Sequence, residues 1–231
     1  MLREINTVHD QRPLTITSET LNMIKLHHLN KSRSKRIIWL LEELGVEYQV
    51  IPYQRDQTTH RAPASLKAIN PLGKSPVIQD GELVLSESGA IVDYLVSRYG
   101  AQTLAPAINT PEHARYIQWL HFAEGTAAYP LITRYLLGVD DNQNCFLGGF
   151  AREQMSEVLT FVNDELANKD YLISGQFTGA DVLNSFVFEK ISEASGLNHF
   201  PNIESYLMRI LDRPAALKAE SLELKYEQEE S

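Results

Sequence analysis

Residues 24–45, IKLHHLNKSRSKRIIWLLEELG, change from a strand pattern to a helix pattern within a single segment. Residues 24–28 alternate as a short strand does, and a helix is predicted from about Arg33 to Leu44. Gly45 is the residue type that commonly ends a helix in a left-handed conformation. The apolar stripe of the predicted helix consists of Ile37, Ile38, Leu41 and Leu44. A strand followed at once by a helix is typical of an α/β unit.

The chain continues this α/β pattern as far as Gly100. Asp80-Gly81, between two apolar runs, is a strong hairpin signal. Ser88 is placed to begin the last helix of this region. Strands are predicted at 48–52, 76–79 and 82–85, with a short helix at 66–69. The order βαβαββα predicts a domain over residues 23–100 with a sheet of mixed strand direction.

The second half of the chain lacks strand signals. Helical patterns cover 111–137, 150–167, 180–194 and 203–211. They predict an all-α bundle over 111–219, joined to the first domain by a linker at 101–110. The halves also differ in charge: residues 1–104 hold 12 basic and 11 acidic side chains, and residues 105–231 hold 9 and 19. Residues 220–231 are expected to be a solvated acidic tail.

Composition and charge exclude several classes of protein. The chain has 231 residues, 43% hydrophobic and 22% charged, which is typical of a globular protein and not of a disordered one. Its apolar runs are shorter than the roughly 18 residues that a membrane span needs. The net charge of −9 argues against a nucleic-acid partner. The single cysteine, Cys145, permits neither an intramolecular disulfide nor a multi-cysteine metal site, so we expect no metal and a reducing, cytoplasmic compartment.

Five short motifs occur in the order seen in a known family. They are LNKSRSKRIIWLLEELG at 29–45, NPLGKSPV at 70–77, LSESGAI at 85–91, TGAD at 178–181 and RPAAL at 213–217. Together they resemble the cytosolic glutathione S-transferases from residue 23 to about residue 219, and especially the serine-type bacterial and fungal branch. The resemblance implies a thioredoxin-like α/β N-terminal domain followed by an all-α helical-bundle C-terminal domain.

The same resemblance implies an enzyme. A glutathione S-transferase activates the glutathione thiol as a thiolate for nucleophilic attack on a small hydrophobic electrophile, often in detoxification, and glutathione is then a co-substrate. The resemblance further implies a homodimer in contact through residues 88–99 and 111–137, with no nucleic-acid or membrane partner. Two alternatives stay open, a glutathione-dependent peroxidase or reductase and a non-catalytic interaction scaffold of the same fold.

Ser32 is the main candidate for the residue that stabilises the thiolate. A free thiol has a pKa of about 8.5, so ionisation near neutral pH needs a hydrogen-bond donor or a helix N-terminus beside the sulfur. Ser32 stands where the predicted strand gives way to the predicted helix, which is where serine-type members place the activating hydroxyl. Asn30 and Ser34 are alternates, because neighbouring positions serve in some branches. The competing interpretation is that Ser32 only caps the helix.

Pro76 resembles the cis-proline of thioredoxin-like folds. A cis bond before Pro76 would leave the backbone of Ser75 free to pair with the cysteinyl part of glutathione. The competing interpretation is an ordinary trans proline at the start of a strand, which the neighbouring Gly73 and Lys74 make less favourable.

Four further residues are expected to bind the two ends of glutathione. Ser88 and the backbone N–H groups that open its helix would hold the γ-glutamyl carboxylate, and Glu87 would hold the ammonium group. Lys74 and His60 are candidates for the glycyl carboxylate. For His60 the alternative is an exposed loop histidine without a ligand.

Other prominent residues are expected to serve the fold. Thr178 and Asp181 have the spacing of a helix capping box, in which each side chain satisfies a backbone donor. Four basic residues surround the start of the first predicted helix: Lys31, Arg33, Lys35 and Arg36. They could attract an anionic tripeptide, but we expect most of them to be solvated and Arg36 to make a structural ion pair.

Residues 1–22 are expected to form an N-terminal extension. The segment lacks the apolar core of a signal peptide. Its apolar residues Leu14, Ile16 and Leu21 predict that it docks on the protein, either within the dimer contact or as an extra strand at the edge of the sheet.

Overall fold

The computed structural model describes residues 23–100, 103–173 and 175–228, so the predicted docking of the 1–22 extension lies outside it. The first half contains β1 (Ile24–Leu29), α1 (Lys35–Leu44), β2 (Tyr48–Tyr53), α2 (Ala64–Ile69), β3 (Val77–Asp80), β4 (Leu83–Ser86), α3 (Ser88–Leu95) and the π-helix η1 (Val96–Gly100). The second half contains α4 (Pro111–Phe122), the π-helix η2 (Ala123–Ala127), α5 (Ala128–Val139), α6 (Phe146–Glu165), α7 (Gly179–Ser195), α8 (Pro201–Leu211) and α9 (Pro214–Gln228). The predicted α/β first half and helical second half are confirmed.

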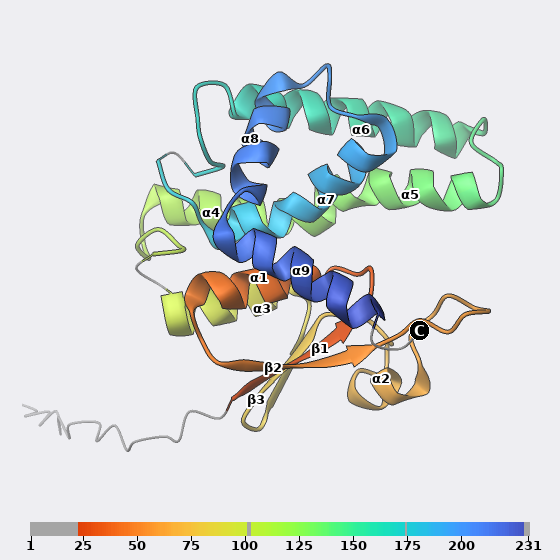
Figure 1. Ribbon diagram of the computed structural model, residues 1–231. Helices are drawn as coiled ribbons and strands as arrows, with labels where there is room; N and C mark the ends of the chain where they lie inside the picture. Colours follow the sequence, from red (N-terminus) through yellow and green to blue (C-terminus); the bar gives the residue numbers. More distant parts are fainter. Residues whose placement is uncertain (1–22, 101–102, 174, 229–231) are drawn as a thin grey trace, which may run out of the picture.

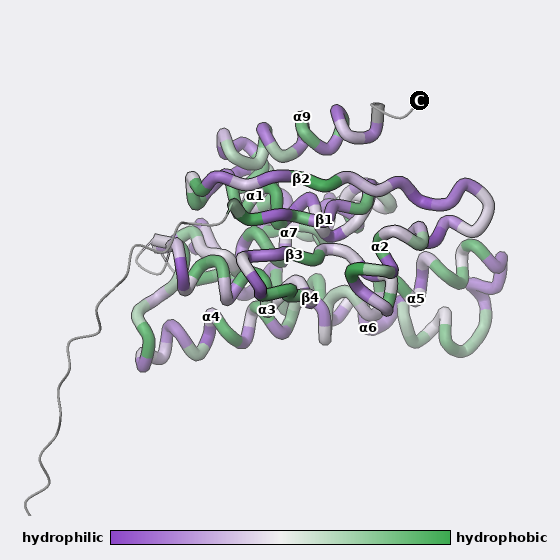
Figure 2. Tube along the Cα trace, turned by 90° about the horizontal axis from the view of Figure 1, so that it is seen from below, coloured by the Kyte–Doolittle hydropathy of each residue, from purple (hydrophilic) through white to green (hydrophobic). Residues whose placement is uncertain are grey.

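The four strands form one sheet in the order β2-β1-β3-β4 (Figure 2). β1 runs parallel to β2, whereas β3 runs antiparallel to both β1 and β4. The hairpin between β3 and β4 turns at Gly81 and Glu82, one residue later than the sequence suggests, because Asp80 still pairs with Leu83. Gly81 has a positive φ of 59°, which glycine adopts without strain.

α1 and α3 connect the sheet to the helical half. They lie on the face of the sheet that is turned toward the other helices, and both contact α7 (Figure 1). Gly179, at the start of α7, lies so close to α3 that a Cβ atom there would come within 2.7 Å of Val92 Cγ1. This close approach of two helices therefore requires a glycine.

The predicted capping box is present at the start of α7. Thr178 Oγ1 accepts a hydrogen bond from the N–H of Ala180 at 3.3 Å, and the Asp181 carboxylate accepts one from the N–H of Thr178 at 2.8 Å. Asp181 also accepts from the N–H of Leu172 and from the hydroxyl of Tyr206. Both members of the capping box are fully buried, which fits a structural role.

Two parts of the helical half differ from the sequence-based prediction. The single helix predicted over 111–137 is interrupted by η2, where the chain makes one wider turn between α4 and α5. Residues 220–228, predicted to be a solvated tail, belong to α9, which packs along α1 (Figure 1). Glu223 of this helix is only 8% exposed. No helix within the described residues is both long and apolar enough to cross a membrane.

Candidate active site at the end of the first strand

Three predicted binding segments meet at one end of the sheet. His27 of β1 pairs with Val77 of β3, and Val77 pairs with Ser86 of β4, so the three residues form one row across the sheet. The loop after β1, the turn before β3 and the start of α3 after β4 all adjoin this row. Because β3 runs opposite to its two neighbours, all three segments emerge on the same side of the row. The fold therefore brings together residues that lie far apart in the sequence.

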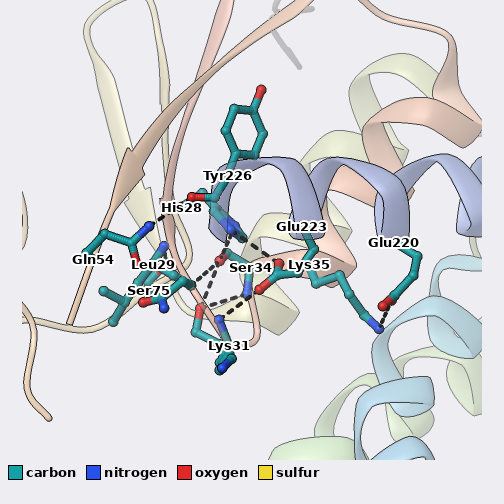
Figure 3. Close-up of polar contacts among 12 residues, drawn as sticks. His28, Leu29, Lys31, Ser34, Lys35, Gln54, Ser75, Glu220, Glu223 and Tyr226 are labelled. Carbon is teal, nitrogen blue, oxygen red and sulfur yellow. Dashed lines mark hydrogen bonds and ion pairs between the residues drawn. The ribbon is translucent and has the colours of Figure 1, made fainter. Parts of the chain in front are cut away.

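Ser75 ties the turn before β3 to the end of β1. Its Oγ accepts a hydrogen bond from the N–H of Leu29 at 3.2 Å and donates one to the carbonyl of His27 at 2.9 Å, and Figure 3 shows Ser75 beside Leu29. The Ser75–Pro76 bond is cis, as the resemblance implies, and Pro76 is buried. The side chain of Ser75 is thus engaged with β1, while its backbone lies outside the ladder of β3, which begins at Val77.

Glu87 and Ser88 form the turn into α3. Glu87 has a φ of 72°, a left-handed conformation that costs a residue with a Cβ atom roughly 1–3 kcal/mol. The side chain of Glu87 is exposed, whereas Ser88 is buried in the first turn of α3. This turn leaves the Glu87 carboxylate in solvent at the N-terminus of α3, where the backbone N–H groups carry partial positive charge.

Ser32 and Ser34 lie in the loop that joins β1 to α1. Their hydroxyl oxygens are 2.8 Å apart, and the N–H of Ser34 donates to Ser32 Oγ at 3.2 Å. Ser34 is fully buried and stands at the N-cap position of α1, which begins at Lys35 and not near Arg33. Ser34 therefore holds the N-cap position in place of Ser32, but its side chain makes no capping hydrogen bond. Ser32 is half-buried, whereas Ser34 is closed to solvent.

Asn30, the other alternate, holds the loop that follows β2. Its Oδ1 accepts a hydrogen bond from the N–H of Arg55 at 3.2 Å, and its own N–H donates to the carbonyl of Tyr53 at 3.1 Å. Arg55 Nη1 in turn donates to the carbonyl of His60 at 3.2 Å. These contacts give Asn30 a structural role at the same end of the sheet.

A line of polar groups runs from Ser32 into the protein. Ser34 Oγ lies 2.8 Å from Ser32 Oγ and also 2.8 Å from His28 Nδ1. The other ring nitrogen of His28, Nε2, lies 3.2 Å from Glu223 Oε2 of α9 (Figure 3). Glu223 Oε1 accepts a hydrogen bond from the N–H of Lys31 at 2.7 Å. The line thus begins in the loop after β1 and returns to it through α9.

Burial shifts the ionisation of the two inner groups of this line. It lowers the pKa of His28 from 6.5 to about 4, so the imidazole is neutral at pH 7. It raises the pKa of Glu223, although the Lys31 N–H and the Lys35 ammonium oppose that rise. Both shifts favour the uncharged form of the group, as expected where water is excluded.

The four basic residues near the start of α1 are all paired with acids, although Lys31, Arg33 and Lys35 keep side-chain surface exposed to solvent. Arg33 and Arg36 both contact Glu124 of η2, at 2.9 Å and 2.5 Å. Arg36 is fully buried and also donates to the carbonyl of Leu183 in α7, which confirms its structural ion pair. The remaining pairs are Lys31 with Glu227, and Lys35 with Glu189 and Glu220. These pairs hold the loop and α1 against the helical half.

His60 and Lys74 both expose their side chains. His60 has a φ of 55° in the loop after β2, and its N–H donates to the carbonyl of Asp56 at 2.8 Å. Lys74 directly precedes Ser75, and its carbonyl accepts a hydrogen bond from Asn70 Nδ2 at 3.0 Å. Of the two, only Lys74 belongs to a segment that adjoins the row across the sheet.

No motif in the sequence singles out His28 or Glu223. The sequence pattern indicates only that His28 belongs to a short strand and that Glu223 is one of several glutamates in an acidic stretch. A usable signal exists for Glu223, because it follows Ala216 by seven residues and Ala219 by four, which is the spacing of one helix face. Both alanines are buried in α9, so an acid at the same face marks a position of interest.

The chain is similar to known proteins along most of its length. Residues 21–97 match the glutathione S-transferase N-terminal domain, and residues 150–214 match the glutathione S-transferase C-terminal domain. Glutathione S-transferase 3 of Schizosaccharomyces pombe is 32% identical over 216 residues, which cover 87% of this chain and 88% of that protein. Glutathione S-transferase 1 of Saccharomyces cerevisiae is 30% identical over 214 residues, with coverage of 83% and 91%.

Solved structures share the fold. A glutathione S-transferase from Actinobacillus pleuropneumoniae has a TM-score of 0.79 at 35% identity, over 89% of this chain and 96% of that one. A glutathione transferase from Phanerochaete chrysosporium, solved in complex with oxidized glutathione, has a TM-score of 0.76 at 25% identity, over 88% and 97% of the two chains.

Proposed function

The chain belongs to the glutathione S-transferase family, and we propose that it holds the glutathione thiolate with a hydrogen bond from Ser32 for attack on a small hydrophobic electrophile. The observation that carries this proposal is the meeting of the Ser32, Ser75 and Glu87 segments at one end of the sheet. A tripeptide thiol needs a hydroxyl for its sulfur and polar groups for its backbone and its charged ends. These three segments supply both.

Each segment would bind a different part of glutathione. The free backbone of Ser75 would pair with the cysteinyl residue as an added strand does. Ser88 and the N–H groups of α3 would hold the γ-glutamyl carboxylate, and the exposed Glu87 carboxylate would bind the ammonium group. For the glycyl carboxylate we favour Lys74 over His60, because Lys74 adjoins Ser75.

The half-buried hydroxyl of Ser32 suits a thiolate. A hydrogen bond to a charged group contributes about 1.5–3 kcal/mol, which corresponds to a pKa shift of about one to two units. A shift of that size would bring a thiol of pKa about 8.5 close to neutrality. Ser34 supports this arrangement, because its N–H donates to Ser32 Oγ and so orients the hydroxyl.

We also propose that the protein is a homodimer and works in the cytoplasm, where thiols are kept reduced. Support for a partner surface comes from α5, which overlaps the predicted 111–137 contact region and extends two residues beyond it. Several of its apolar side chains are exposed: Tyr129, Ile132, Tyr135, Leu136 and Val139. Their spacing groups them along the helix, and contiguous exposed apolar patches typically mark interaction sites.

The alternative functions are less favoured. A reductase that forms a disulfide with its own thiol needs a cysteine near Ser32, but Cys145 lies at the start of α6, where its Sγ accepts from the N–H of Gly148 at 3.4 Å. Reduction of a peroxide by the thiolate alone would use the same Ser32.

Calorimetric titration with glutathione tests the proposal. We expect one binding site per chain, and weaker binding by the Ser88→Ala variant. Turnover with an activated aryl halide and with an organic peroxide, measured side by side, then separates transferase from peroxidase activity. A wild-type protein that does not bind glutathione would leave the scaffold as the remaining function.

A further inference from the structure

We propose that Glu223 of α9 accepts the proton of the glutathione thiol, which reaches it through Ser32, Ser34 and His28. This inference rests on the proposed function, because it needs the glutathione sulfur to lie at Ser32. It gives a residue of the second half of the chain a direct part in the chemistry of the loop after β1.

The line of contacts from Ser32 to Glu223 is continuous. Its steps measure 2.8 Å, 2.8 Å and 3.2 Å, and Ser34 and His28 are fully buried. His28 Nε2 and Glu223 Oε2 lie 3.2 Å apart and are closed to solvent, and neither atom has a hydrogen-bond partner within the described part of the chain. Two such atoms lying side by side require a proton between them, because a buried polar atom without a partner is costly.

Before glutathione ionises, the carboxylate at the inner end determines where the protons lie. A Glu223 carboxylate can only accept, so His28 carries its proton on Nε2. His28 Nδ1 then accepts from the hydroxyl of Ser34, and Ser34 Oγ accepts from the hydroxyl of Ser32. All donors of the line therefore point inward, toward Glu223.

Ionisation moves each proton by one place. The S–H bond breaks, its electron pair stays on sulfur, and its proton bonds to Ser32 Oγ. The former Ser32 proton passes to Ser34 Oγ, the Ser34 proton to His28 Nδ1, and the His28 Nε2 proton to Glu223 Oε2. Each intermediate group gains one proton and loses one, so its charge does not change. The net result is that one negative charge leaves Glu223 and appears on the sulfur.

This transfer agrees with the environments of both inner groups. His28 changes only its tautomer, as its low pKa requires, since an imidazolium is unfavourable there. Burial, which raises the pKa of Glu223, favours the protonated product. Afterwards every donor points outward, and the Ser32 hydroxyl donates to the thiolate.

Glu223 lies among charged groups of both signs, and three further acids face the two lysines beside it. Lys31 of the loop pairs with Glu227 at 2.5 Å, and Lys35 of α1 pairs with Glu220 of α9 at 2.8 Å and with Glu189 of α7 at 2.6 Å. Other titratable groups lie close by: Tyr226 of α9 packs 5.9 Å from the His28 ring, and His27 bonds to Tyr53 of β2 at 2.8 Å and to Gln79 of β3 at 3.1 Å.

The test compares Glu223→Gln with Glu227→Gln, a matched variant four residues further along α9. Glutamine at position 223 keeps an oxygen that can accept the hydrogen bond from the Lys31 N–H, but it has no carboxylate to accept a proton. We expect the thiolate absorbance of glutathione bound to Glu223→Gln to titrate about one pH unit higher than in wild type. Turnover in weakly acidic buffer should fall about tenfold, because one pKa unit is a factor of ten. Affinity for S-methylglutathione, which has no thiol proton, should stay within about twofold of wild type.

A second measurement uses the unaltered protein with glutathione and a pH-indicator dye. If Glu223 keeps the proton, weakly acidic wild-type samples will form thiolate with less than one proton released per thiolate. Release of one full proton at every pH would overturn the relay. The relay would also be overturned if the thiol of bound glutathione had the same pKa in Glu223→Gln as in wild type, while Ser32→Ala raised that pKa. The proposed function would then still stand, because Ser32 would still stabilise the thiolate. A wild-type protein that binds no glutathione overturns both.

Discussion

Ser32 Oγ lies 2.8 Å from Ser34 Oγ, yet only the Ser32 side chain is partly open to solvent. The pair therefore divides between an outer hydroxyl that can contact a ligand and an inner hydroxyl that contacts the protein. Ser34 also donates its N–H to Ser32, so the outer hydroxyl is held in one position. This division makes the roles of the two serines separable by mutation.

Ser32→Ala should lower turnover by about 10- to 150-fold and raise the pKa of the bound thiol. The reason is the loss of one hydrogen bond to a charged sulfur, which contributes about 1.5–3 kcal/mol. Ser34→Ala keeps the outer hydroxyl, so its turnover should lie between those of wild type and Ser32→Ala. Steady-state rates with an activated aryl halide measure both. A full rate in Ser32→Ala, together with a loss in Asn30→Ala, would contradict the assignment.

Glu87→Gln and Ser88→Ala should each weaken glutathione affinity about tenfold and leave kcat at saturation nearly unchanged. Both residues would contact the γ-glutamyl end, which is remote from the sulfur. Glu87→Gly is an informative control, because it removes the carboxylate and also relieves the positive φ. It should bind as weakly as Glu87→Gln without losing stability. Wild-type affinity in all three variants would remove this turn from the binding site.

Protonation of His28 should destabilise the protein in weak acid. Its pKa is about 4 when folded and 6.5 when unfolded, so between these values the unfolded state binds the extra proton. The free energy of unfolding should therefore fall as the pH drops from 6.5 toward 4, by up to about 3 kcal/mol from this group. Burial raises the pKa of Glu223 and of Asp181, and these carboxyls act in the opposite direction.

The comparison that isolates His28 is urea unfolding of wild type and His28→Gln at several pH values. The variant lacks the titrating ring, so its stability should fall less between neutral and weakly acidic buffer. Equal slopes for the two proteins would show that another group controls the acid response.

Arg36→Met should destabilise the protein far more than Arg33→Met. Both side chains contact Glu124 and lie over the ring of Phe186, at 5.3 Å and 5.5 Å. Arg36 has no exposed side-chain surface, whereas Arg33 is 30% exposed. Loss of one partner of a buried ion pair costs about 3 kcal/mol or more, and loss of an exposed pair costs about 1 kcal/mol or less. Similar denaturant midpoints for the two variants would argue against this difference.

Sedimentation should give the mass of two chains at micromolar concentration. Tyr135→Glu, at a site that is 69% exposed on α5, should shift the protein toward one chain, because a charge opposes burial of an apolar patch. Met208→Glu is the control, since Met208 is an equally exposed apolar residue on α8, outside the proposed contact. A wild-type monomer, or dissociation by the control alone, would exclude this interface.

Local sequence patterns predict those parts of the fold that depend on neighbouring residues. Strand alternation, the apolar stripe of α1, the Thr178–Asp181 capping box and the hairpin near Gly81 are such features. The buried face of α9 gives a weaker pattern, because it combines alanines with Glu223 and has no continuous apolar stripe. The contact of Glu223 with His28 has no local signal at all, since only the folded chain brings the two residues together.

The bond between Lys31 and Glu223 joins residues that are 192 positions apart in the chain. Ribosomes add about 5 to 20 residues per second, so Glu223 is synthesised about 10 to 40 s after Lys31. During that interval the Lys31 N–H and the Nε2 atom of His28 lack their contact with α9, whereas His28 Nδ1 can already contact Ser34. A nascent first domain therefore carries the sheet and the two serines before it has the base, and translation of the second half sets the time at which the reactive loop is completed.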